Sequence, residues 1–204
     1  MDIIEEINAV HREVGERPDR PGARTVLLRR RYDAAVEDVW DAITSPDRIR
    51  RWFLPVSGDL RLGGTYQLEG NAGGEIRQCE PPRLLRVTWV FGGAETLETG
   101  FSEVEVRLSE GADGQTVFEL EHAATVDAER WADYGPGAVG VGWDLTLLGL
   151  GLHLRGESID DPDAWLLSPE AKEFMTGSSK AWGTTPGVTD SMVENTTRFY
   201  VPEA

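Results

Sequence analysis

Apolar residues near the start of the chain recur at helical spacing. They follow one another at intervals of four, three and four residues: Ile3, Ile7, Val10 and Val14. Such a stripe lies on one side of an amphipathic helix. We therefore expect a helical arm over residues 1–20, ended by Gly15 and Pro18.

The next two segments change period. Residues 24–33 read RTVLLRRRYD, an alternation typical of a first strand. Residues 34–53 return to helical spacing, with a break at Ser45 and Pro46. They predict one helix before the break and a second, short helix through Ile49 and Trp52.

After Pro55 glycines divide the chain into short apolar runs, as the turns between hairpin strands do. The expected strands are 59–62, 65–69, 75–80, 84–91, 99–108 and 116–123, with a turn at 110–115. No helix pattern interrupts this series. It therefore predicts an antiparallel meander rather than alternating strands and helices.

The last third of the chain is helical again. Residues 138–154 predict a long apolar helix, and Gly142, Gly149 and Gly156 fall on one stripe, which requires close packing against a sheet or a ligand. Two further helices are expected beyond it, one capped by Ser168 with Pro169 in its first turn and one following Asp190. With 204 residues and 40% apolar composition, one domain with additions is expected.

Net charge and residue counts limit the classes of partner that the protein is expected to bind. The net charge of −16 opposes nucleic acid and anionic membrane surfaces, which need clustered cations. One cysteine and three histidines without ligand spacing predict neither a disulfide nor a metal site. We also expect no cofactor.

The chain has no sign of a membrane or export segment. Its acidic start lacks the features of a signal peptide. The apolar stretch 138–154 contains Asp144 and His153, which are costly inside a bilayer. We expect a buried helix in a cytoplasmic protein.

Several motifs resemble one known superfamily. They are VWDAITSPDRIRRWF at 39–53, GDLRLGG at 58–64, VTWVF at 87–91 and VGWDLTLLGLGLHL at 141–154. With the order of elements, they resemble the START-like (SRPBCC) superfamily, in the branch named for activators of the heat-shock chaperone ATPase.

The resemblance implies an α+β helix-grip fold, with a curved antiparallel sheet of six or seven strands around a long C-terminal helix and extra helices at both ends. It gives an arm at 1–20, a START-like domain at 24–156 and a helical extension at 157–204. It also implies a cavity between sheet and long helix that relatives use for apolar compounds. Since the fold alone does not assign an activity, three hypotheses remain open.

The first hypothesis is a binding protein for an apolar or aromatic small molecule. The expected contacts are Trp52, Phe53, Tyr66, Glu75, Trp89, Phe91, Phe101, His122, Trp143 and Leu147. Pockets of this kind are mostly apolar with a few polar groups, and Glu75 is the candidate for a polar handle or, alternatively, a solvent-side charge.

The second hypothesis is a cyclase, hydrolase or dehydratase acting on an aromatic or polyketide-like substrate, with His122 or Asp144 as the acid–base group. The alternative for His122 is a core histidine satisfied by hydrogen bonds. For Asp144 it is an ion pair with an arginine of the first strand or with Arg130. No neighbouring residues suggest a catalytic triad.

The third hypothesis is an interaction module. The arm and the extension would then contact a partner, although we do not expect a chaperone, or they would form a homodimer through their apolar stripes. The sequence GPGAVG at 135–140 matches a dinucleotide motif but lacks the preceding parallel strand. It is expected to be a tight loop into the long helix, whose free amide groups would suit a ligand carboxylate or phenolate.

Overall fold

One antiparallel sheet carries most of the core. The computed structural model describes residues 1–92 and 100–202. Its strands are β1 Val10–Glu16, β2 Ala23–Tyr32, β3 Val56–Gly58, β4 Thr65–Leu68, β5 Ala72–Glu80, β6 Leu84–Thr88, β7 Val90–Phe91, β8 Ser102–Glu110 and β9 Thr116–Thr125. Their order is β1-β2-β9-β8-β6-β5-β4-β3, with β7 paired to β5.

The concave face of the sheet is apolar because alternate residues of each strand point to the same side. On β8 and β9, Val104 is the register partner of His122, and Val106 that of Leu120. Val104, Val106 and Leu120 are buried. Charged residues such as Glu119 take the opposite face, where Glu119 pairs with Arg29. The long helix packs on the apolar, concave face.

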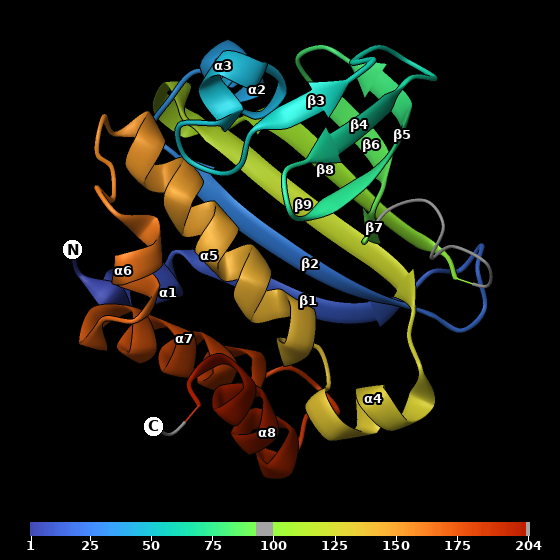
Figure 1. The fold of residues 1–204 in the computed structure, drawn as a ribbon, viewed down its shortest axis with the longest axis vertical. Helices are drawn as coiled ribbons and strands as arrows, with labels where there is room; N and C mark the ends of the chain where they lie inside the picture. The colour runs from blue at the N-terminus through green and yellow to red at the C-terminus, as the bar shows by residue number, and fades with distance from the viewer. Residues whose placement is uncertain (93–99, 203–204) are drawn as a thin grey trace.

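The helices lie at the ends and on one side of the sheet (Figure 1). They are α1 Ile3–Asn8, α2 Val36–Thr44, α3 Pro46–Ile49, α4 Ala128–Tyr134, α5 Gly137–Leu154, α6 Pro162–Leu166, α7 Pro169–Trp182 and α8 Asp190–Tyr200. The long helix α5 crosses in front of the sheet, and α7 and α8 pack on its other side (Figure 1).

Helix α5 is apolar on every side, and by length and composition it is the one described helix that would suit a membrane. In the fold it is a core helix. Trp143, Leu147 and Leu150 pack with the sheet residues. Leu148 and Leu152 pack with α1 and α7, for example against Phe174.

The predicted helical arm is wrong beyond Ala9. Helix α1 ends at Asn8, and residues 10–16 form β1, which pairs antiparallel with β2. The spacing of four between Val10 and Val14 is even, so it fits one face of a strand as well as one face of a helix. The unpaired edge of β2 decides in favour of the strand.

The predicted strand 59–62 is also wrong. The strand in this region is β3, and residues 59–64 form turns in which Arg61 N donates to Asp59 O and Gly64 N donates to Arg61 O. Leu60 and Leu62 are exposed, so their alternation has no buried face. The predicted strand 99–108 begins at Ser102, and residue 99 lies outside the described residues.

Within residues 1–92 and 100–202 the sheet therefore has nine strands, where six or seven were expected. The arm adds β1, and the expected strand 84–91 divides into β6 and β7. Helix α4 has no counterpart among the expected elements. The two helices of the extension are confirmed, and Ser168 accepts from Ala171 N as an N-cap.

The arm and the extension both pack on α5. Their apolar stripes, which suggested a homodimer, are largely covered within the chain, since Ile3 and Ile7 are buried with Phe174 of α7. The division into a domain at 24–156 with an arm and an extension stays a prediction.

Candidate functional site

An inner cavity of about 210 Å³ lies between the concave face of the sheet and α5. Its lining is almost entirely apolar. Of the predicted contacts, Tyr66 and Leu147 line this cavity and no other space described below. Tyr66 is buried and its hydroxyl donates to Thr88 O at 2.8 Å. The single cysteine, Cys79, also lines it.

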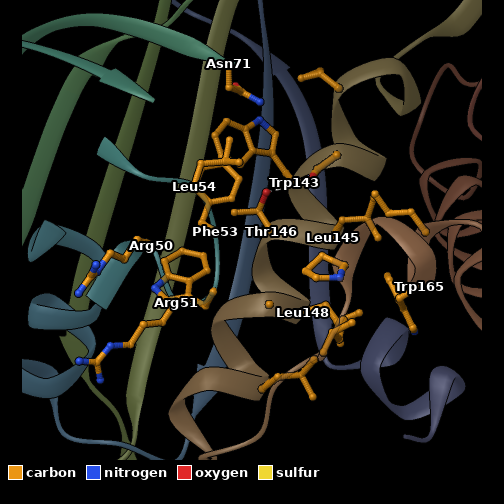
Figure 2. A pocket seen from close by; sticks show the side chains of 18 of the residues that line it. Arg50, Arg51, Phe53, Leu54, Asn71, Trp143, Leu145, Thr146, Leu148 and Trp165 are labelled. Carbon is orange, nitrogen blue, oxygen red and sulfur yellow. Dashed lines mark hydrogen bonds between the residues drawn. The ribbon is translucent and has the colours of Figure 1, made fainter. Parts of the chain in front are cut away.

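A larger outer groove of about 640 Å³ lies on a different flank of α5. One rim is the segment 50–54 after α3, and the other is the segment from Glu157 to Leu166, which includes α6. Figure 2 shows Arg50 and Arg51 at one edge, Asn71 at one end and Trp165 across α5. No local sequence pattern predicts this groove, because it depends on how the extension folds back.

A shared wall separates the two spaces. Its residues line both the inner cavity and the outer groove: Trp52, Phe53, Trp89, Trp143 and Thr146. The ring centroids of Trp89 and Trp143 are 4.9 Å apart, and Trp52 and Phe53 are stacked at 5.6 Å. Four of the ten predicted contacts thus meet in one aromatic layer.

His122 faces the outer groove and is held by two hydrogen bonds. Trp143 Nε1 donates to its Nδ1 at 3.1 Å, and its Nε2 lies 2.9 Å from Ser102 Oγ. An indole N–H can only donate, so Nδ1 carries no proton and Nε2–H donates to Ser102. Burial lowers the pKa of His122 to about 4, which keeps the ring neutral.

This arrangement removes the nitrogen lone pair that a general base needs, because it already accepts from Trp143. Ser102 cannot pass its proton to Nε2, which is itself the donor. His122 therefore corresponds to the alternative of a satisfied histidine, with Trp143 and Ser102 as partners in place of a carbonyl or a carboxylate.

Asp144 lies away from both spaces, in a buried ion pair. Arg12 Nε and Nη2 donate to its two carboxylate oxygens at 3.0 and 2.9 Å. Ser178 Oγ and Trp182 Nε1 also donate to Oδ2, at 2.5 and 3.0 Å. Burial raises the pKa of Asp144, while Arg12 and the other donors act in the opposite direction. The expected ion pair exists, but its arginine comes from β1 rather than from residues 24–33 or Arg130.

Three other candidates lie at or outside the margins of these spaces. Glu75 lines neither and pairs with Arg77 at 3.2 Å. Phe101 lines neither and lies under the Arg20 guanidinium, 4.4 Å from its ring centroid. Phe91 is 68% exposed at the margin of the outer groove.

The loop 135–140 is covered by the C-terminal helices. A Cβ on Gly135 or Gly137 would contact Met192 or Thr196 of α8. Only Ala138 and Val139 of the first turn line the outer groove. The preceding strand, β9, is antiparallel to its neighbours, so the dinucleotide context is missing here.

Residues 33–154 match the family described as Activator of Hsp90 ATPase homolog 1-like protein, a span longer than half of the chain. The chain belongs to this family. No curated protein matches the chain. Within the described residues, no group of three His, Cys, Asp or Glu side chains is arranged to hold a metal.

Among solved structures, the crystal structure of CalU16 from Micromonospora echinospora is 39% identical, covers 91% of this chain and 99% of its own, and has a TM-score of 0.67. DynU16, described as a putative protein in the dynemicin biosynthetic locus, is 22% identical over 65% of this chain and 48% of its own, with a TM-score of 0.56. The Aha1 dimer from Colwellia psychrerythraea is 17% identical over 64% of this chain and 95% of its own, with a TM-score of 0.52.

These matches confirm the resemblance to the Hsp90-activator-like branch and the α+β helix-grip fold. At their low identity, the last two structures show the fold alone.

Proposed function

We propose that this protein binds an apolar or aromatic small molecule between the sheet and α5. The observation that carries the proposal is the inner cavity of about 210 Å³. Protein interiors leave few voids larger than a water molecule. This cavity has a partly open mouth beside the exposed Leu60 and Leu62, and its largely apolar lining offers an apolar ligand a surface away from water.

The lining supports an apolar ligand. Aromatic rings form the shared wall, and the Tyr66 hydroxyl is already engaged with Thr88 O. Burial raises the pKa of Tyr66, so the phenol stays neutral. We place the protein in the cytoplasm as part of the same proposal.

The enzymatic alternative has less support, since His122 and Asp144 are both saturated by donors or acceptors of the chain itself. The family name provides the alternative of a chaperone partner, and the Aha1 dimer provides that of a homodimer. Neither is favoured by a feature of the described surface.

Cys79 gives a direct test, because it is the only cysteine and lines the inner cavity alone. Neutral N-phenylnaphthylamine, a fluorescent apolar probe, is expected to bind and to slow the alkylation of Cys79 by iodoacetamide. The reaction should be run at mildly alkaline pH, because burial raises the pKa of the Cys79 thiol.

Val104→Phe places a ring in the inner cavity, and Val117→Phe is the matched control on the outer face of the sheet. Overpacking costs roughly 1–3 kcal/mol, so Val104→Phe should weaken protection of Cys79 about tenfold and Val117→Phe should not. Binding of the probe without protection of Cys79 in the unmodified protein would refute this site.

A further inference from the structure

The outer flank of α5 has an unusual composition for a helix surface that is only partly covered. Ala138, Val139, Gly142, Leu145, Thr146 and Gly149 lie along it, all partly exposed and all lining the outer groove. Exposed helix flanks normally carry charged residues, and the chain as a whole is 27% charged. An uncharged flank with two glycines forms a smooth apolar floor.

The volume of the groove is that of a pocket for a small molecule. At about 640 Å³ it lies within the range of about 300 to 1,000 Å³ for ligand pockets. Its two rims are Trp52 and Phe53 on one side and Trp165 on the other, which provides aromatic surface for a flat or extended apolar body.

An unpaired donor on the groove is the side-chain amide of Asn71. Asn71 Oδ1 accepts from Ala72 N, whereas its Nδ2 has no partner among the described residues, and Figure 2 shows this side chain directed toward Trp143. Other donors are already used: Tyr200 donates to Ala138 O and Trp165 donates to Glu170.

Positive charge collects at one edge. Arg50 and Arg51 lie side by side there, with their guanidinium groups directed outward (Figure 2). Arg51 has no anionic partner among the described residues, and Arg50 pairs with Asp47 in a fully accessible position, with 59% and 80% of the side chains exposed. Among the described residues that line the groove, the acidic one is Glu157, which pairs with Arg155 at 3.5 Å.

We propose that the outer groove is a second binding site, for an amphipathic organic anion. Its apolar body lies along the flank of α5, and its carboxylate or equivalent anionic group stays at the rim beside Arg50 and Arg51. An anion held at the rim keeps much of its hydration, so this arrangement avoids the cost of burying a charge. The groove shares five lining residues with the inner cavity, whereas Arg50, Arg51 and most of the α5 flank line the groove alone.

Two probes with the same ring system and different charge test this proposal. Anilinonaphthalene sulfonate is an anion, and N-phenylnaphthylamine is its neutral counterpart. In the double variant Arg50→Gln/Arg51→Gln the dissociation constant of the anion should rise about three- to tenfold, as expected for two exposed ionic contacts. The neutral probe, measured in the Val104→Phe background so that the inner cavity contributes little, should bind with unchanged affinity. Arg77→Gln, outside the groove, is the matched charge control and should leave both affinities unchanged.

The location is tested independently of charge. Val139→Trp fills the floor of the groove and should remove binding of the anion, while circular dichroism confirms that the variant is folded. The anion should not slow alkylation of Cys79, and it should still bind Val104→Phe. Equal weakening of both probes in the arginine variant, or protection of Cys79 by the anion, would overturn the proposal, whereas failure of the inner cavity alone would leave anion binding intact.

Discussion

At the scale of single residues, His122 connects the aromatic wall to the sheet. Its Nδ1 accepts from Trp143 and its Nε2 donates to Ser102, so one imidazole fixes the orientation of an indole that lines both spaces. The neutral ring is required for this role, because a protonated Nδ1 would face the indole N–H.

Stability should therefore depend on pH through His122. Its pKa is lowered to about 4 in the folded protein, from 6.5. Below pH 6.5 the unfolded chain binds a proton that the folded chain does not, so stability falls as pH falls from 6.5 to about 4. The loss is at most about 3 kcal/mol at 1.36 kcal/mol per pKa unit.

Urea unfolding across this range measures the effect. His122→Gln keeps an acceptor for Trp143 but does not titrate between pH 6.5 and about 4. The free energy of unfolding of this variant should therefore lack the loss that His122 causes over this range. His153, whose pKa burial also lowers, is present in both proteins and cancels. Identical pH profiles for the two proteins would show that the hydrogen bond does not hold His122 neutral.

Residue types predicted which side chains line the site better than they predicted how those side chains are arranged. Trp52, Phe53, Trp89 and Trp143 were expected near a ligand because large aromatic side chains supply most pocket surface, and the structure brings them together. Asn71 and Arg51 gave no signal, since neither lies in an apolar pattern. Glu75 and Phe101 line neither space. For Glu75 the sequence left a solvent-side charge open, because strand alternation alone does not say which face is concave.

At the scale of elements, α5 and α7 approach closely at a glycine. A Cβ at Gly140 would overlap the buried indole of Trp182, whereas one at Gly142 would meet the Tyr200 hydroxyl at 3.3 Å. The Trp182 ring has little freedom to move, because its Nε1 donates to Asp144.

Gly140→Ala should therefore destabilise the fold, by about 1–3 kcal/mol for overpacking, although alanine is the better helix former by about 1 kcal/mol. Gly142→Ala, two residues away on the groove flank, should change stability by less than about 1 kcal/mol. Thermal unfolding followed by circular dichroism compares them. A Gly140→Ala protein as stable as the Gly142→Ala protein would contradict the close contact with Trp182.

The elements themselves were largely predictable from periodicity. The long helix and the strands from Thr65 onward follow clear patterns, and caps such as Ser168 mark helix starts. The arm was not predictable past Ala9, because the spacing of Val10 and Val14 suits a strand and a helix equally. The neighbouring edge of β2, remote from the local pattern, decides between them.

At the scale of the whole molecule, a buried ion pair links β1 to α5 beside α7. Arg12 of β1 and Asp144 of α5 are 7% and 0% exposed in their side chains. Ser178 and Trp182 of α7 also donate hydrogen bonds to the carboxylate of Asp144. The arm, the long helix and the extension therefore share a buried charge cluster. Its members lie in three separate segments of the sequence, so no local pattern predicts their contact.

Arg12→Met should destabilise the protein by about 3–5 kcal/mol, because it leaves the carboxylate of Asp144 buried without its counter-ion. This is a large part of a typical total of about 5–15 kcal/mol. Arg29→Met is the matched control. It breaks the surface pair with Glu119, in which the Arg29 side chain is 43% exposed, and should cost less than about 1 kcal/mol.

The double variant Arg12→Met/Asp144→Leu separates the loss of a contact from the cost of an orphaned charge. It removes both ions, so it should recover much of the stability that Arg12→Met loses. Urea unfolding followed by tryptophan fluorescence measures the stability of each variant. If Arg12→Met costs no more than Arg29→Met, the cluster contributes no more than a surface ion pair.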